Sequence, residues 1–285
     1  MTVELRQLTP AAEEGWATLF ALAEETTEEW ILVGGQMMFV LAVEHRAERV
    51  RPTEDIDVVV NLRVRPDGTE WLSRWLEKRD FVLEGVSTDQ IGHRFTRPTS
   101  SGRGKVIFDV LAPSGVGERA RLTTVPPART VQAPGSLQAF DRSRLVEVVI
   151  SDFSDHNERT GTVRCPDLLG ALVAKAAATT IPVRENPERD WQDAALLLSV
   201  LADPLGTAAR LNKRDRQHLD RLRPLLGTSH RGWENLSGEA RQRGTAALSF
   251  LIDCLPQPGI RGEHRRAAEG AWTGRQNAPQ TTSGG

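Results

Sequence analysis

Apolar positions recur with two different periods at the beginning of the chain. Between 9 and 26 they return every three or four residues behind a Thr-Pro pair, which predicts a capped helix. A short apolar run at 30–34 predicts a strand that ends in two glycines, and 36–48 has the pattern of a mostly buried helix. Alternation then predicts a second strand at 54–62. The expected order is therefore strand, glycine turn, helix, strand.

Both kinds of pattern continue through the first half of the chain. The segment 67–81 places apolar residues on one stripe and cations elsewhere, as in an amphipathic helix. Further strands are expected at 81–85, 93–98, 105–113 and 145–150. Helical patterns then follow at 166–180, 187–202 and 237–255. Strands and helices therefore mix in the first half, whereas the second half is mostly helical.

This distribution predicts an α+β fold class, with an amino-terminal mixed sheet and flanking helices followed by a mostly helical carboxy-terminal domain. We place the boundary after residue 160, which gives domains at 1–160 and 161–256. The end of the chain, 257–285, is polar, rich in glycine and without periodicity. It is expected to be a disordered tail.

Composition narrows the class of protein. With 285 residues, 39% of them hydrophobic, and a net charge of -2, the chain can bury a sizeable core and has no global basic field. Cys165 and Cys254 are the two cysteines, which excludes a disulfide-dense scaffold and a cysteine zinc cluster. No apolar run approaches roughly 18 residues, and the first residues carry acids where a signal peptide would be basic. We expect a cytoplasmic protein without a membrane partner.

Two acids interrupt the alternating strand at 54–62. Because side chains alternate on a strand, Asp55 and Asp57 share one face while the apolar residues between and beyond them line the other. Two carboxylates one strand repeat apart can converge on a divalent cation, for which Mg²⁺ is the first candidate and Mn²⁺ the second. Asp109 adds a third acid within an apolar strand. The alternatives are a solvated pair at the strand border and a strand-end cap at Asp109.

Gly34 and Gly35 stand where the preceding strand ends and the helix begins. Free backbone N–H groups at a helix start, without side chains in the way, favour close approach of a phosphate. A glycine pair is also common in a simple turn. Combined with three acids on strands, it indicates metal-assisted nucleotidyl transfer, in which one ion activates a hydroxyl and another stabilises the pyrophosphate leaving group.

These residues resemble the nucleotidyltransferase superfamily related to DNA polymerase β, whose signature is an apolar residue, a glycine pair, D-h-[DE] and a later third acid. The sequence GGQ followed by HRAERVRPTEDID is more specifically similar to the AbiEii/AbiGii toxin family. In that family a glycine turn and helix lead to an R-x-[TS]-x-D-I-D strand. Arg51, Thr53, Asp55 and Asp57 fit this pattern.

The family also carries a lysine on a later helix and an R-x-K-D-x-x-D motif that opens the next one. Lys175 and the pair Asp190 and Asp193 occupy those places, although Pro187 replaces the motif's arginine and Arg189 its lysine. The resemblance implies that Asp190 orients Lys175 toward a nucleotide phosphate. Alternatively, Lys175 extends to solvent, and the two aspartates are favourable charges in a helix's first turn.

The resemblance implies an enzyme that transfers a nucleoside monophosphate from an NTP to an RNA 3′ end, with tRNA as the leading candidate acceptor, and releases pyrophosphate. The implied biological role is the toxin of a toxin–antitoxin or phage-defence pair, with an antitoxin as partner. The implied catalytic residues are Asp55, Asp57, Asp109, Lys175 and Asp190, of which the first three bind two Mg²⁺ ions. The implied nucleotide-binding residues are Gly34, Gly35, Arg51, Thr53, Lys175 and Asp193. A small hydroxylated acceptor and a non-catalytic nucleotide- or protein-binding module are the alternatives.

A second group of cations lies between 210 and 231, with seven Arg or Lys residues against two acids. It could follow a nucleic-acid backbone. Leucines at 211, 219, 222 and 226 could instead form a core stripe, which would make these cations a solvated helix face. Five histidines show no metal-ligand spacing and are interpreted as structural or surface residues: His93, His156, His218, His230 and His264.

Overall fold

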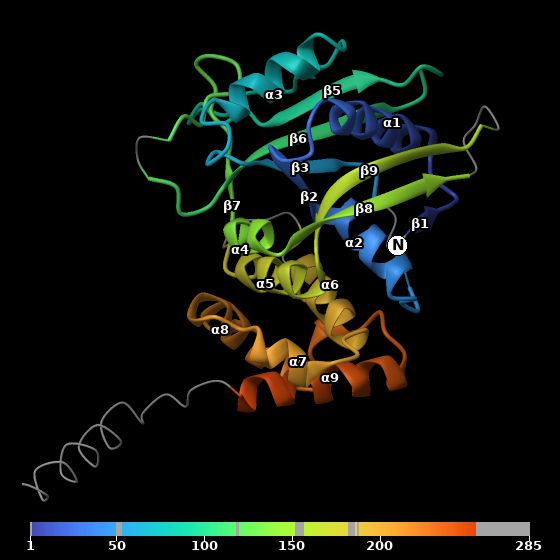
Figure 1. Ribbon diagram of the computed structural model, residues 1–285, viewed down its shortest axis with the longest axis vertical. Coiled ribbons are helices and arrows are strands. Elements are labelled where there is room, and N and C mark those ends of the chain that lie inside the picture. Colours follow the sequence, from blue (N-terminus) through green and yellow to red (C-terminus); the bar gives the residue numbers. More distant parts are fainter. Residues whose placement is uncertain are drawn as a thin grey trace, which may run out of the picture.

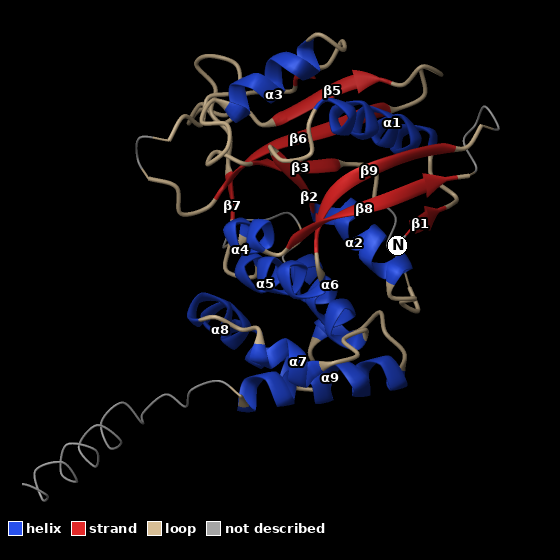
Figure 2. Cartoon of the chain, viewed as in Figure 1, coloured by secondary structure: helices blue, strands red, loops and turns tan. Residues whose placement is uncertain are grey.

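The computed structural model describes residues 2–49, 53–117, 120–151, 157–181, 186 and 188–254. The chain forms an α/β part that contains both sheets and a helical part packed beneath it (Figure 1). Figure 2 shows the same division by element type, with strands confined to the first part. The mixed α/β architecture expected from the hydrophobic pattern is therefore confirmed.

The larger sheet brings together strands from the first half of the chain. Its strands are β2 (Trp30–Val33), β3 (Ile56–Val60), β6 (Lys105–Pro113), β5 (Arg94–Pro98) and β4 (Val82–Leu83), in that spatial order. β3 and β6 are parallel, whereas the other neighbours in this series are antiparallel. A short strand, β7 (Gln132–Ala133), adds to β6. β3 is shorter than the expected strand at 54–62, so Asp55 lies just before it.

The smaller sheet joins the two ends of the α/β part. β8 (Ser143–Ile150) lies at its centre, parallel to β1 (Thr2–Leu5) and antiparallel to β9 (Arg159–Pro166). The expected domain boundary after residue 160 falls inside β9. Because β9 pairs with β8 along its whole length, the helical part begins beyond it, at Leu168.

Helices cover the sheets and then form the helical part. In the first half these are α1 (Pro10–Glu25), α2 (Gly34–Glu44), α3 (Gly68–Glu77) and α4 (Ser136–Asp141). The second half contains α5 (Leu168–Ala178), α6 (Glu188–Ser199), α7 (Pro204–Ala209), α8 (Lys213–Leu219) and α9 (Gly238–Asp253), with 3-10 helices at Asp220–Leu226 and Arg231–Trp233. No helix in the described ranges is long and apolar enough to cross a membrane.

α1 packs against both sheets. It contacts β3 and β6 of the larger sheet and β9 of the smaller one. Trp16, Leu19 and Leu22 on this helix are completely buried, and fully burying such side chains stabilises a fold by about 1.5–3 kcal/mol each. Thr9 caps the helix by accepting a hydrogen bond from the Ala12 amide at 3.3 Å, as the Thr-Pro signal predicts.

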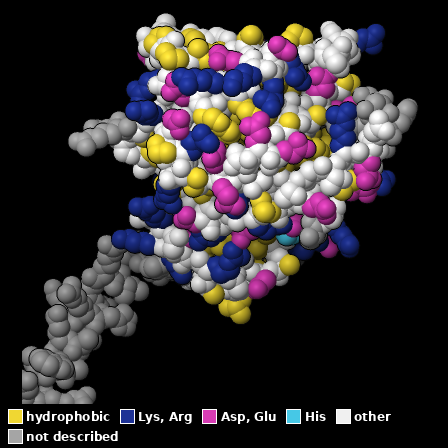
Figure 3. Space-filling view, turned by 45° about the horizontal axis from the view of Figure 1, so that its top comes forward, with side chains coloured by type: hydrophobic (Ala, Val, Ile, Leu, Met, Phe, Trp, Pro, Cys, Tyr) yellow, Lys and Arg dark blue, Asp and Glu magenta, His cyan; other side chains and the backbone are white. Residues whose placement is uncertain are grey.

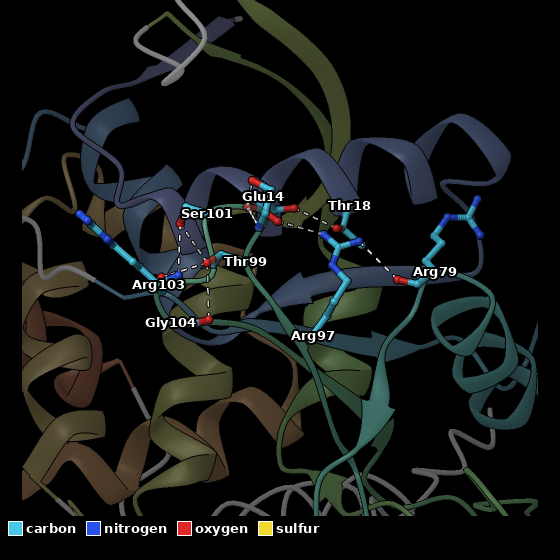
Figure 4. Close-up of polar contacts among 9 residues, drawn as sticks. Glu14, Thr18, Arg79, Arg97, Thr99, Ser101, Arg103 and Gly104 are labelled. Atoms are coloured by element: carbon cyan, nitrogen blue, oxygen red, sulfur yellow. Dashed lines mark hydrogen bonds and ion pairs between the residues drawn. The ribbon is translucent and has the colours of Figure 1, made fainter.

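Polar contacts fix one end of β5 against α1 (Figure 4). The Glu14 carboxylate accepts hydrogen bonds from the Ser100 amide and hydroxyl at 2.7 Å, and from Arg97 at 3.3 Å. The Arg97 guanidinium also lies 4.8 Å from the centre of the Phe81 ring. The β5–β6 hairpin is therefore held in register, which fixes Arg94 at the other end of β5.

The surface carries both signs of charge intermixed over the face seen in Figure 3. In the basic segment at 210–231, three leucines of the expected stripe, Leu211, Leu219 and Leu222, are buried, whereas Leu226 is half-buried and Leu225 is buried in its place. Arg221 and Arg223 are exposed. The leucines thus form the core stripe of a helical segment and the arginines its solvated face. This arrangement supports the second of the two interpretations of that segment.

Candidate functional site

Strand register places four residues in one row across the larger sheet. Val33 on β2 pairs with Asp57 on β3, Asp57 pairs with Asp109 on β6, and Asp109 pairs with Arg94 on β5. Residues directly opposite each other on paired strands project from the same face. The row therefore brings two of the predicted acids together at the end of β2, where the glycine turn begins.

The glycine turn packs directly against the acidic row. Gly34 has φ +66°, a left-handed conformation that favours glycine, and a Cβ atom built there would overlap the Asp57 carboxylate. A Cβ atom on Gly35 would lie 2.6 Å from the Thr53 hydroxyl oxygen. α2 starts at Gly34 with no side-chain cap, so the amides of its first turn remain donors for a ligand. Both glycines are required by close approach and not only by the turn.

A buried glutamine holds the segment before β3 in place. Gln36, which is fully buried on α2, donates a hydrogen bond to the Thr53 carbonyl at 2.8 Å and accepts one from the Trp16 indole at 2.9 Å. Because α1, α2 and the Thr53 backbone meet at one side chain, the position of Asp55 relative to the glycine turn is fixed. No sequence pattern had indicated this role for Gln36.

The predicted site residues surround a cavity of about 570 Å³, which we call the first cavity. Of the predicted residues, its walls include Gly34, Gly35, Asp55, Asp57, Asp109, Lys175 and Asp190. Thr53 lies behind this wall, against Gly35, and Asp193 lies beneath Lys175. Arg51 is outside the described residues. The structure thus brings together acids from the sheet and a lysine from the helical part, more than 60 positions apart in the chain.

The three predicted acids of the cavity, Asp55, Asp57 and Asp109, differ in their hydrogen-bond partners, and Asp55 and Asp57 have raised pKa values. Arg94 donates to both oxygens of Asp109, from Nε at 3.0 Å and from Nη2 at 2.8 Å. The same Nη2 atom also donates to Asp55 at 3.1 Å. No hydrogen bond or ion pair reaches the Asp57 carboxylate from the described residues. Burial, together with the nearby charges of Asp109 and Asp55, raises the pKa of Asp57 to about 7. Burial also raises the pKa of Asp55, against the effect of Arg94.

Lys175 on α5 is buried and paired with both acids of the motif that opens α6. Its Nζ atom lies 2.7 Å from Asp193 Oδ2 and 3.4 Å from Asp190 Oδ1. Burial favours the neutral amine, but the two carboxylates outweigh it and raise the pKa of Lys175. Lys175 therefore stays charged at the cavity wall and does not extend to solvent. Asp193, which the resemblance assigned to nucleotide binding, is its closer partner.

Three cavity residues were not assigned a role from the sequence. Arg94 is the cation that compensates Asp109, and its only sequence signal is that a buried carboxylate requires a partner. His93, which is half-buried, lines the cavity beside it, and burial lowers the pKa of this imidazole. Arg189 also lines the cavity, and no hydrogen bond or ion pair joins its guanidinium to the part of the chain that the structure describes.

The carboxylates of the first cavity can be compared with the ligands that a divalent cation requires. Among the described residues, no group of three His, Cys, Asp or Glu side chains is arranged to hold a metal ion, and Arg94 is hydrogen-bonded to both Asp109 and Asp55. Asp57, by contrast, accepts no hydrogen bond from the described residues, and it lines the cavity together with Asp55, close enough for the two charges to interact. Asp55 and Asp57 therefore fit one hard cation such as Mg²⁺, with open positions for water and phosphate. A second ion at Asp109 would require Arg94 to move.

No family model matches the chain, and no curated protein sequence matches it. Among solved structures, the crystal structure of JHP933 from Helicobacter pylori aligns with 94% of this chain and 100% of its own, at a TM-score of 0.38 and 12% sequence identity. So remote a likeness carries no argument about the function of this chain.

Proposed function

We propose that the protein is a metal-dependent nucleotidyltransferase that transfers a nucleoside monophosphate from an NTP to an RNA 3′ end, with tRNA as the leading acceptor, and releases pyrophosphate. The observation that carries the proposal is the row formed by Val33, Asp57 and Asp109, which sets two acids directly against the start of α2. A carboxylate cluster beside free helix amides suits a metal–triphosphate complex.

Each group of residues has a distinct part in this proposal. Asp55 and Asp57 hold a divalent ion, which when bound neutralises the developing charge on the phosphates. The amides of Gly34 and Gly35 donate to the triphosphate. Lys175 presents a fixed positive charge at the cavity wall, because Asp193 and Asp190 hold its ammonium group. Its role is to orient the phosphates, as the family resemblance implies.

The biological role follows from the same resemblance. We propose that the protein acts as an AbiEii-like toxin whose partner is an antitoxin protein, and that modification of RNA ends is the toxic activity. Support comes from the order glycine turn, D-I-D, third acid, lysine and D-x-x-D along the chain, all of which converge on one cavity except Asp193, which lies beneath Lys175.

Incubation of the purified chain with Mg²⁺, each labelled NTP and total bacterial tRNA tests the proposal. Asp57→Asn removes a charged metal ligand with almost no change in shape, and Asp89→Asn, at an exposed position outside the cavity, is the matched control. Label on tRNA with the parent and the control, but not with Asp57→Asn, would support the proposal. Transfer only to small hydroxylated molecules would change the acceptor, and Mg²⁺-dependent NTP binding without transfer to either would indicate a binding module.

A further inference from the structure

A second cavity, of about 670 Å³, lies next to the first one, along the segment that carries Thr53, Glu54 and Asp55. Asp55 and Arg189 line both this cavity and the first one. Its remaining walls come from the loop between β1 and α1, from the first turn of α1, from α2 and from the residues before β3. In Figure 1, β1 and α2 lie on the same side of the molecule as the amino terminus. The two cavities therefore meet at one carboxylate and one guanidinium.

Specific contacts hold the wall between the cavities in place. Thr53 stands at its base, where the Gln36 side chain fixes its carbonyl and Gly35 packs against its hydroxyl. On the far side, Gln7 has φ +55°, a conformation that costs free energy for a residue with a side chain. Arg6 beside it is oriented by two hydrogen bonds to Glu4, at 3.0 and 2.8 Å. A cavity of this size and definition is typical of a small-ligand or nucleotide subsite.

The chemistry of nucleotidyl transfer requires two subsites with this relationship. The attacking oxygen and the leaving pyrophosphate lie on opposite sides of the α-phosphorus in an in-line displacement. The glycine turn and Lys175 belong to the first cavity alone, so the triphosphate is held there. Asp55 is shared, so an oxygen beside it can be approached from the second cavity. The acceptor must then enter from that side.

We propose that the second cavity is the acceptor subsite and that it takes the 3′-terminal nucleotide of a single-stranded RNA end. This proposal rests on the proposed transferase function. The terminal hydroxyl oxygen forms a bond to the α-phosphorus, the bond from that phosphorus to the bridging oxygen breaks, pyrophosphate leaves and the hydroxyl proton passes to solvent. Arg189, which has no ion-pair partner among the described residues, faces the phosphoryl group as it passes between the cavities.

The side chains of the second cavity suit a nucleotide. Phe39, which is partly buried against the core, lines the cavity with an aromatic side chain of the kind on which any base can stack. Arg6 is exposed at the rim, where the penultimate phosphate of an RNA end would lie. Glu54 lines the wall next to Asp55, and its charge disfavours a phosphate deeper in the cavity. The terminal ribose and base can therefore enter, while the RNA backbone stays outside.

The test measures binding of a labelled RNA oligonucleotide with a free 3′ end to the full chain, together with NTP binding and KM for both substrates. Phe39→Leu keeps the apolar contact but removes the stacking face, and Arg6→Gln removes the rim charge. We expect Phe39→Leu to weaken RNA binding and raise KM for RNA at least about fivefold, the lower limit for a lost base stack. Arg6→Gln should change both quantities in the same direction, and NTP binding should be unchanged in both variants. Glu54→Gln should strengthen RNA binding. Arg103→Gln, an exposed arginine that lines neither cavity, is the control.

Two results would overturn the proposal in ways that differ from failure of the transferase function. If Phe39→Leu, Arg6→Gln and Glu54→Gln all leave RNA binding and KM for RNA unchanged while the parent labels RNA, the acceptor binds elsewhere and the transferase function stands. If the parent labels only a small hydroxylated molecule and these variants alter its KM, the cavity is an acceptor subsite but not for RNA. Failure of the parent to transfer to any acceptor would refute the proposed function itself.

Discussion

The Arg94 guanidinium donates to both carboxylate oxygens of Asp109, from Nε at 3.0 Å and from Nη2 at 2.8 Å. The two residues are direct partners on β5 and β6, so the strand register itself produces the pair. The same Nη2 atom reaches Asp55 at 3.1 Å. A single monovalent cation thus neutralises part of a cluster that would otherwise repel itself, and it does so at the place where a divalent ion would bind Asp109.

Replacement of Arg94 by glutamine should make the fold more dependent on metal. Without the guanidinium, Asp109 and Asp55 are uncompensated beside Asp57, so we expect a lower melting temperature in EDTA and a larger rise in Tm on addition of Mg²⁺ than in the parent. Calorimetry with and without Mg²⁺ measures both. Arg97→Gln on the same strand is the matched control, because Arg97 pairs with Glu14 away from the cavity. An equal Mg²⁺ shift in parent and Arg94→Gln would contradict this account.

Substitution of Gly34 and of Gly102 can distinguish the cost of backbone strain from the cost of a steric overlap. Both have left-handed backbones, at φ +66° and +68°, but a Cβ atom on Gly34 would overlap Asp57, whereas one on Gly102 would meet nothing within 4 Å. Gly102→Ala should therefore cost only the conformational term, about 1–2 kcal/mol, and leave NTP binding intact. Gly34→Ala should cost more and abolish NTP binding. Urea unfolding and equilibrium nucleotide titration of the two variants give the comparison. If both variants lose the same stability and bind NTP equally well, the glycine turn is not part of the nucleotide site.

Elements with strong periodicity could be predicted from the sequence. α1, β2, β5, β6 and β8 lie within a residue or two of the expected segments, because each buries one clear face or a continuous apolar run. α2 was also expected, but it ends at Glu44 and not at residue 48. β1, β7, β9 and α4 were not predicted. β9 reads RTGTVRCP, with too few apolar residues for an alternation signal, and becomes a strand only because its full length pairs with β8. The boundary set at residue 160 fell inside β9 for this reason.

The candidate site was predictable in part. Asp57 and Asp109 broke apolar strands, so their cost of burial signalled a partner or ligand. Arg94 and Gln36 gave no such signal, because the sequence does not show which buried group an arginine or a glutamine contacts. Their roles depend on register and on contacts between distant segments, with Arg94 opposite Asp109 and Gln36 between Trp16 and Thr53. Sequence spacing cannot supply those relationships.

The buried lysine provides a stability test that is independent of catalysis. Lys175→Met removes the cation but leaves Asp190 and Asp193 buried, and breaking a buried pair in this way costs about 3–5 kcal/mol. The double variant Lys175→Met with Asp193→Asn removes the closer charge as well and should recover part of that loss. Chemical denaturation gives the free energy of unfolding for all three proteins. If the double variant is less stable than Lys175→Met, the lysine is not held by Asp193 as the structure indicates.

Asp57 should make stability depend on pH in the direction opposite to a salt-bridged acid. Its pKa is raised from 3.8 to about 7 by burial and by its acidic neighbours, so between these values the folded state keeps a proton that the unfolded state releases. The folded state therefore loses stability as pH rises through this window, by up to about 1.4 kcal/mol per pH unit, and the loss is complete above pH 7. Asp57→Asn lacks this term, so its stability relative to the parent should increase from pH 4 to pH 7 and then remain level.

Urea unfolding in EDTA across this pH range measures the difference in stability between Asp57→Asn and the parent. Mg²⁺ should reduce this difference most at high pH, where the cation binds a carboxylate without displacing a proton. If the difference in unfolding free energy between parent and variant is the same at all pH values, Asp57 is ionised throughout this range and its pKa is not raised.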